Sequence, residues 1–153
     1  NGISMDAAGE KLLVHGNQQV GIVNRLEYWT RSGTVWSYIG LVPNITAYHA
    51  GNSADVFHIS GDGMWCVAGK PNAGGSPAGQ AITVCKLIGT TWTHVADLEE
   101  TGYGSLGVSI NYDGSVITAQ GNLGTAGLSI YHRDGDNFSL IGIVYSPVAS
   151  YNG

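Results

Sequence analysis

A motif that returns three times along the chain constrains its fold more than any other feature of the sequence. Each copy starts with an isoleucine, reaches an aspartate and a glycine within a few residues, and continues into a hydrophobic run. The copies start at Ile3, Ile59 and Ile110. The intervals between them are 59 − 3 = 56 and 110 − 59 = 51 residues, about the length of a four-stranded unit in a repeat protein. The chain is therefore predicted to contain three copies of one supersecondary unit.

A second motif repeats in the later half of each unit. A glycine stands three residues before an aromatic residue, and a hydrophobic residue follows three residues after it. The copies are Gly33, Trp36 and Ile39; Gly89, Trp92 and Val95; and Gly135, Phe138 and Ile141. Glycine suits the tight turn of a β-hairpin, so each glycine is predicted to join the third and fourth strands of its unit. The aromatic residues recur at one position and are therefore predicted to belong to the core.

The last unit shows its strands most clearly, because turn signals such as Asp-Gly separate its β-prone runs. The four runs are Val108–Asn111, Ser115–Gln120, Gly127–His132 and Phe138–Val144. The third strands of the other units, Arg25–Thr30 and Ala81–Leu87, alternate with period two, and helical spacing is absent. The predicted fold is all-β, with three four-stranded antiparallel units. They cover about 1–48, 49–103 and 104–147, and 148–153 lead toward a next unit.

The segments LGVSINYDGSVITAQG and IYHRDGDNFSLIG resemble FG-GAP-type β-propeller repeats, which are integrin-like. The resemblance implies propeller blades and a role in adhesion or ligand binding. It does not extend to the calcium-binding loop of that family, Asp-x-Asp-x-Asp-Gly. The turns at Asp62, Asp113 and Asp134 offer too few spaced carboxylates for Ca²⁺, which takes about six to eight oxygen ligands. No cofactor is expected, and plain hairpin turns are preferred over the alternative of Ca²⁺ sites.

Three blades are too few to close a ring, since propellers have about four to eight. We expect a homo-oligomer in which two copies make a six-bladed ring. Further blades on a longer polypeptide are the second alternative, and an open arc packed on other proteins is the third.

The composition narrows the setting. Only 11% of the residues are charged, 24 are glycine, and the net charge is −5 with six Lys and Arg. Nucleic acid is therefore not an expected partner. No apolar run approaches the roughly 20 residues needed to span a bilayer, so membrane insertion is not expected either. A polar but mostly uncharged surface favours an extracellular, cell-surface or virion location. Cys66 and Cys85 fall on neighbouring predicted strands, and either a disulfide or two buried thiols fits them.

Ligand-binding candidates lie in the loops between units and on the innermost strands. Tyrosine, asparagine and histidine on such loops are adaptable groups for recognising glycans or protein surfaces. His58 precedes Ile59 on an innermost strand and is predicted to face a central channel, with Ser109 at the equivalent place in the next unit. The candidates are Tyr48, His49, Asn52, His58, Tyr103, Ser109, Tyr151 and Asn152. The alternative for the three tyrosines is packing between blades.

Catalytic motifs are missing from the sequence. The histidines lack the spacings of zinc sites, and Gly102–Gly107 is not the strand-to-helix elbow of a serine hydrolase. The sequence therefore predicts a non-enzymatic module, with no catalytic residues, that binds a glycan or protein. Two alternatives remain open. One is a purely structural assembly subunit. The other is a glycan hydrolase with channel-facing carboxylates about 5–10 Å apart.

Overall fold

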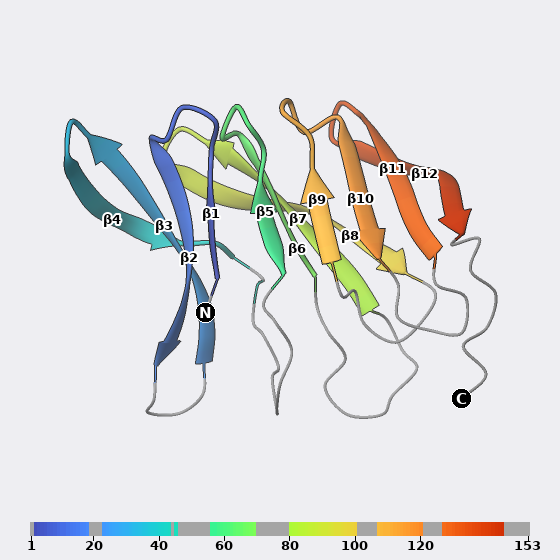
Figure 1. The fold of residues 1–153 in the computed structure, drawn as a ribbon, viewed down its shortest axis with the longest axis horizontal. Helices are drawn as coiled ribbons and strands as arrows, with labels where there is room; N and C mark the ends of the chain where they lie inside the picture. The colour runs from blue at the N-terminus through green and yellow to red at the C-terminus, as the bar shows by residue number, and fades with distance from the viewer. Residues whose placement is uncertain are drawn as a thin grey trace.

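The computed structural model describes residues 2–18, 23–43, 45, 56–69, 80–100, 107–120 and 127–145. These residues form twelve strands in three four-stranded antiparallel sheets and contain no helix (Figure 1). The all-β prediction with three four-stranded units is confirmed. None of the described residues belongs to a helix that could cross a membrane.

Each sheet is built from strands that are hydrogen-bonded in the order of the sequence. The first sheet contains β1 (Ile3–Met5), β2 (Lys11–Gln18), β3 (Val23–Ser32) and β4 (Val35–Leu41). The second contains β5 (Phe57–Ile59), β6 (Trp65–Gly69), β7 (Gln80–Ile88) and β8 (Thr91–Glu100). The third contains β9 (Gly107–Ile110), β10 (Val116–Gln120), β11 (Gly127–Asp134) and β12 (Asn137–Tyr145).

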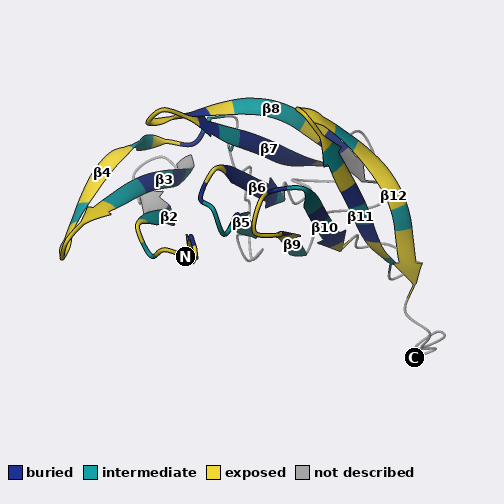
Figure 2. Cartoon of the chain, turned by 90° about the horizontal axis from the view of Figure 1, so that it is seen from above, coloured by how far each residue is buried: buried dark blue, intermediate teal, exposed yellow. Residues whose placement is uncertain are grey.

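The three sheets stand side by side in an open arc. In Figure 2 the outer strands β4, β8 and β12 lie on its convex side, while β5 and β9 lie on the concave side. One apolar core fills the space between the first and second sheets and a separate core fills the space between the second and third. The hydrophobic effect thus acts between sheets, so each sheet is stabilised by its neighbours rather than by itself.

Both predicted turn motifs are glycine turns with left-handed backbone. The glycines that join the first and second strands of each sheet are Gly9, Gly63 and Gly114, and those that join the third and fourth are Gly33, Gly89 and Gly135. All six have positive φ between 60° and 72°, a conformation that glycine adopts without steric penalty. The prediction of hairpins at Gly33, Gly89 and Gly135 is confirmed.

The register of the first strand differs from the sequence alignment. Met5, not Ile3, is the equivalent of Ile59, because Met5 pairs with Leu12 as Ile59 pairs with Cys66. In both pairs the partner lies three residues after the turn glycine. The offset arises because the three units share the spacing between the turn glycine and the second strand, whereas the spacing between the aspartate and the glycine varies.

The shift gives Asp6 a different counterpart. Asp6 now matches Ser60 and Asn111 instead of Asp62 and Asp113. A side-chain oxygen at each of these three positions accepts the backbone N–H five residues later, at 2.9–3.0 Å. One turn position is therefore filled by three different acceptors, which explains why the residue type does not repeat.

The repeated aromatic residues are not equally buried. Trp92 is 3% exposed and meets Tyr28 of the first sheet edge-on, with ring centroids 5.6 Å apart. Phe138 packs in the same way on Trp65 of the second sheet, at 6.0 Å. Trp36 is only half-buried, because none of the described sheets packs on that face of the first sheet. The prediction of a core residue therefore holds for Trp92 and needs correction for Trp36.

The cysteines lie directly opposite each other on β6 and β7. Both are free thiols with no exposed surface. Burial, together with the neighbouring Cys85, raises the pKa of the Cys66 thiol well above its usual value. Of the two alternatives left by the sequence, the structure shows the pair of buried thiols.

Candidate functional site

One side chain from each innermost strand occupies the same position of the repeat. Ser4 on β1, His58 on β5 and Ser109 on β9 are equivalent, since they pair with Leu13, Val67 and Thr118 at the same distance from the turn glycine. His58 and Ser109 thus occupy matching positions, as the sequence predicted. Among the predicted site residues, these are the two that the structure describes.

These side chains connect each sheet to the next. The Oγ of Ser4 accepts a hydrogen bond from the backbone N–H of Ile59 at 3.0 Å. The Nδ1 of His58 accepts one from the backbone N–H of Ile110 at 3.2 Å. A ring nitrogen that accepts carries no proton, so the neutral His58 ring has its proton on Nε2. Toward a ligand, this ring can donate a hydrogen bond through Nε2 and cannot act as a base through Nδ1.

The upper and lower edges of the sheets in Figure 1 differ in their connections. The glycine turns lie at the upper edge, and the strand ends that lead into the longer connections lie at the lower edge. The remaining candidates belong to those connections. Tyr48, His49, Asn52, Tyr103, Tyr151 and Asn152 lie outside the described residues.

Carboxylates at the glycine-turn end have structural partners. Asp6 accepts from the backbone N–H groups of Glu10 and Lys11 at 2.8 and 3.0 Å. Asp62 accepts from the backbone N–H of Met64 at 2.9 Å. Asp113, which is fully exposed, has its pKa held below the usual value by hydrogen bonds from the Ser115 hydroxyl and backbone. These carboxylates therefore accept hydrogen bonds that shape the turns.

Two acidic residues, Glu99 and Glu100, end the outer strand β8 of the second sheet. Their backbone pairs with Ala81 and Gln80 of β7. No group of three or more His, Cys, Asp and Glu that could hold a metal ion occurs in the described ranges.

One polar cluster in the second sheet was missed at the level of sequence. The buried Thr83 hydroxyl donates to Asp97 Oδ1 at 2.8 Å, and His94 Nε2 lies 3.4 Å from Asp97 Oδ2. In a regular strand, His94 and Asp97 would point to opposite faces because they are three residues apart. A bulge opposite Val84 and Cys85 brings them to one side. The sequence carries no clear signal for that bulge. Since the Thr83 proton points at the carboxylate, the cluster fixes Asp97 and does not form a hydroxyl nucleophile activated by histidine.

Comparison with known proteins identifies the fold. No family model and no curated protein matches the chain, so the resemblance to FG-GAP repeats stays a prediction. Among solved structures, a protein of Bacteroides fragilis provisionally named 6-phosphogluconolactonase matches with a TM-score of 0.66 and 14% identity, over 95% of this chain and 38% of that one. A Bacteroides uniformis protein with the same provisional name matches with a TM-score of 0.64 and 12% identity, over 94% and 39%. A Lactobacillus plantarum protein matches with 0.67 and 11%, over 94% and 40%.

These likenesses establish a propeller-like all-β fold. The chain spans less than half the length of the structures that it matches. They also correct the expectation that the chain is not an enzyme, because the same fold occurs in proteins provisionally named as enzymes. The absence of local motifs does not exclude a catalytic site, because function depends on the geometry of a site and not on the fold that carries it.

Proposed function

We propose that the chain is a three-bladed part of a β-propeller that hydrolyses a carbohydrate-derived lactone or ester. The observation that carries this proposal is the likeness over 94–95% of the chain to proteins provisionally named 6-phosphogluconolactonase. It is an argument from fold, and the residues of this chain must then fit the chemistry. Each four-stranded sheet is one blade, and β1, β5 and β9 line the central channel.

Hydrolysis of a lactone adds water to the ring carbonyl and leaves a hydroxy acid. Negative charge develops on the carbonyl oxygen in the transition state, so a hydrogen-bond donor aimed at that oxygen accelerates the reaction. The Nε2–H of His58 fits that role, since the hydrogen bond from Ile110 to Nδ1 fixes both its tautomer and the orientation of its ring. Attack by water also requires a general base that accepts the proton of the water.

The test measures acid release in a pH-stat with 6-phosphoglucono-δ-lactone and glucono-δ-lactone. Spontaneous hydrolysis and heat-denatured protein set the background. We expect a rate above background for the native protein. The variant His58→Ser places at this position the residue that the other two blades carry, so it keeps a hydroxyl acceptor for Ile110. It should fold normally and lose about 10²–10³-fold in kcat, the effect of removing one oxyanion donor.

A matched control separates chemistry from structure. Ser4→Ala removes the equivalent hydrogen bond between the first and second blades and leaves His58 in place. It should lower the free energy of unfolding with little effect on kcat. The proposal fails if native protein shows no rate above background on either lactone. Glycan binding without turnover would favour the receptor-binding module expected from the sequence.

A structural role in assembly is the second candidate. The observation that favours it is that the outward faces of the first and third blades expose large apolar side chains, among them Ile3 and Ile141. Such faces in a soluble propeller are covered by further blades.

A further inference from the structure

We propose that the two open faces of the arc bind each other in a second copy of this chain, so that the third blade of one copy packs on the first blade of the next. The inference rests on the propeller architecture and is independent of whether the protein hydrolyses lactones. Its basis is a set of contacts that occurs at both internal blade interfaces. The first blade carries one partner of each such contact on its outward face, and the third blade carries the other.

The first repeated contact lies on the innermost strands. At the first interface, Ser4 accepts from the N–H of Ile59, and at the second, His58 accepts from the N–H of Ile110. The next acceptor in the series is Ser109, which is exposed behind the third blade. The donor with no blade in front of it is the N–H of Met5, the equivalent of Ile59 and Ile110. Among the described residues, one acceptor and one donor of this series therefore remain, on the third and the first blade.

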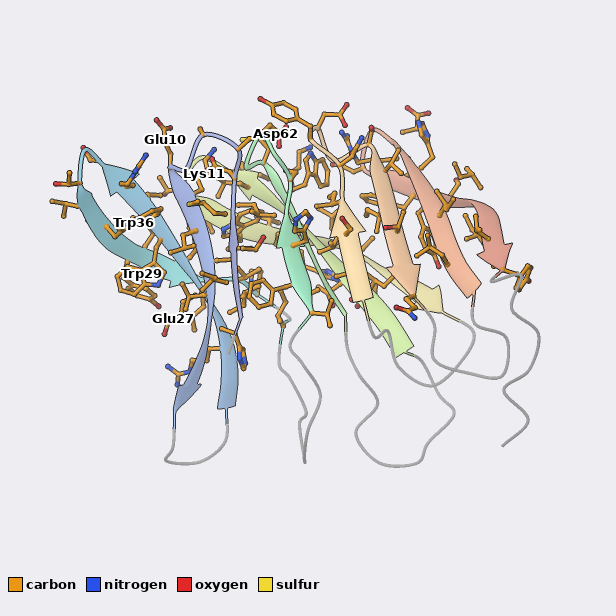
Figure 3. All side chains as sticks on the ribbon, viewed as in Figure 1. Glu10, Lys11, Glu27, Trp29, Trp36 and Asp62 are labelled. Atoms are coloured by element: carbon orange, nitrogen blue, oxygen red, sulfur yellow. The ribbon has the colours of Figure 1, made fainter. Side chains whose placement is uncertain are left out.

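The second repeated contact lies at the glycine turns. Lys11 lies against Gly63 and Trp65 against Gly114, where an added Cβ would be 2.7 and 2.5 Å from the respective side chain. Lys11 also donates to the Asp62 carbonyl at 3.2 Å, and Figure 3 shows both residues at the turn end. Val116 is the equivalent of Lys11 and Trp65. When two copies meet, Val116 of one copy would cover Gly9, the turn glycine in the first blade of the other copy.

Backbone groups at the turns extend the same pattern. The Ala7 N–H donates to the Gly61 carbonyl at 2.9 Å, and the Asp62 N–H donates to the Tyr112 carbonyl at 2.8 Å. Ala7 is the counterpart of Gly61 and Tyr112 in the first blade, and Asp113 is the counterpart of Asp62. When two copies meet, the N–H of Asp113 and the carbonyl of Ala7 would therefore form the bond seen at the second interface, whereas the donor at the first interface lies one residue earlier in the repeat.

The face of the third blade that points away from the second is apolar. We call it the trailing face; it consists of Val116, Leu128, Ile130, Ile141 and Val144. Their equivalents in the second blade are Trp65, Ile82, Val84, Val95 and Leu98, all of which pack in the core against the third blade. Ile141 and Val144 are 62% and 55% exposed, although the same positions one blade earlier are covered.

The outward face of the first blade is apolar as well. We call it the leading face; it consists of Ile3, Met5, Trp29 and Trp36. Their equivalents in the second blade are Phe57, Ile59, Cys85 and Trp92, which pack in or against the first core. Ile3 and Met5 are 75% and 54% exposed. Figure 3 shows Trp29 and Trp36 on the side of the first blade that faces away from the second.

A second copy supplies a partner for each face. Its leading face brings the Met5 N–H to the Ser109 hydroxyl and apolar side chains to Ile141 and Val144, continuing the internal interface. Contact between unlike faces is heterologous, and it gives a closed ring where the rotation per blade allows and an open assembly where it does not. Two copies that close would make six blades.

The experiment measures mass in solution and uses one variant for each face. Variant T carries Ile141→Asp and Val144→Asp on the trailing face. Variant L carries Ile3→Asp and Met5→Asp on the leading face. The control is Ile88→Asp, an exposed hydrophobic residue at a hairpin tip of the middle blade, where the third blade has Asp134. Native protein and the control should show at least twice the 15.9 kDa of one chain. T and L alone should be monomers, since each buried carboxylate weakens association by roughly tenfold or more.

Mixing the two variants provides the decisive readout. T keeps an intact leading face and L an intact trailing face, so an equimolar mixture should form dimers that contain one of each, and native mass spectrometry identifies them. Circular dichroism confirms folding; if a variant is unfolded, Ser109→Val and Ile3→Ser replace the aspartate pairs. A monomeric native protein at about 100 μM, well above a micromolar Kd, overturns the proposal. The proposal is also overturned if only one of the two variants loses its dimers and no mixed dimer forms. The dimer would then join two copies of the same face. Turnover is measured separately, so failure here leaves the hydrolase proposal standing.

Discussion

Two tryptophans at one position of the repeat offer a controlled measurement of what a neighbouring blade contributes to stability. Trp92 lies in the core between the first and second blades, whereas Trp36 is half-buried on the open face. The substitutions Trp92→Ala and Trp36→Ala remove the same atoms from the same place in a β-hairpin. The difference between their effects therefore reports on the adjacent blade.

The magnitude follows from burial. Truncation of a buried tryptophan lowers the free energy of unfolding by about 3–5 kcal/mol, and the edge-on contact of Trp92 with Tyr28 is included in that range. Among the described residues Trp92 Nε1 has no hydrogen-bond partner. Removing this unpaired group offsets about 1 kcal/mol. We therefore expect the free energy of unfolding to fall by about 3 kcal/mol for Trp92→Ala. For Trp36→Ala we expect a fall of about 1 kcal/mol, because the native Trp36 side chain is already partly exposed to solvent.

The assay is urea unfolding at a concentration where native protein is monomeric, followed by circular dichroism. A change of 1 kcal/mol corresponds to about 2–4 °C in Tm for a chain of this size, so thermal unfolding should show shifts of about 6–12 °C and 2–4 °C. Trp92→Phe keeps most of the packing and removes the unpaired N–H, and it should be less damaging than Trp92→Ala. Equal losses for the two alanine variants would refute the reasoning, because stability would then come from within each sheet.

Three further predictions concern single residues. Gly114→Ala should lower the free energy of unfolding by more than Gly135→Ala: both have positive φ, but an added Cβ meets a tryptophan ring at 2.5 Å only at Gly114, and urea midpoints will compare the two. The carboxyl of Asp113 should titrate below the usual aspartate range by NMR, and Ser115→Ala should raise its pKa. Since the folded pKa is depressed, this group contributes stability above its unfolded pKa and loses it as pH falls through the folded value. Cys66, whose pKa is raised by burial, should react with a thiol reagent only as fast as the protein unfolds. Its contribution to stability should be lost as pH rises above the usual thiol pKa, and rapid labelling of native protein would contradict this placement.

Much of the fold was readable from local patterns. The glycines at positions 33, 89 and 135 require left-handed backbone that other residues rarely adopt, so they mark the hairpins directly. Alternation in β7 and β11 likewise reports the two faces of a strand. The candidate site was accessible only in part: His58 and Ser109 were found from the repeat, but their role depends on the blade beside them.

The sequence by itself determined the number of units, their all-β character and the hairpin turns, because turn conformation and side-chain alternation depend on residues close together in the chain. Tertiary structure decided the rest. The register places Asp6 with Ser60 and Asn111, and the bulge brings His94 to Asp97. The bond from Ile110 to His58 selects the tautomer of that ring, and burial of Trp92 but not Trp36 follows from which sheet has a neighbour. Each of these depends on groups more than two residues apart meeting in space. Local preference cannot specify such contacts, because their energy arises only when separate strands or sheets exclude water between them.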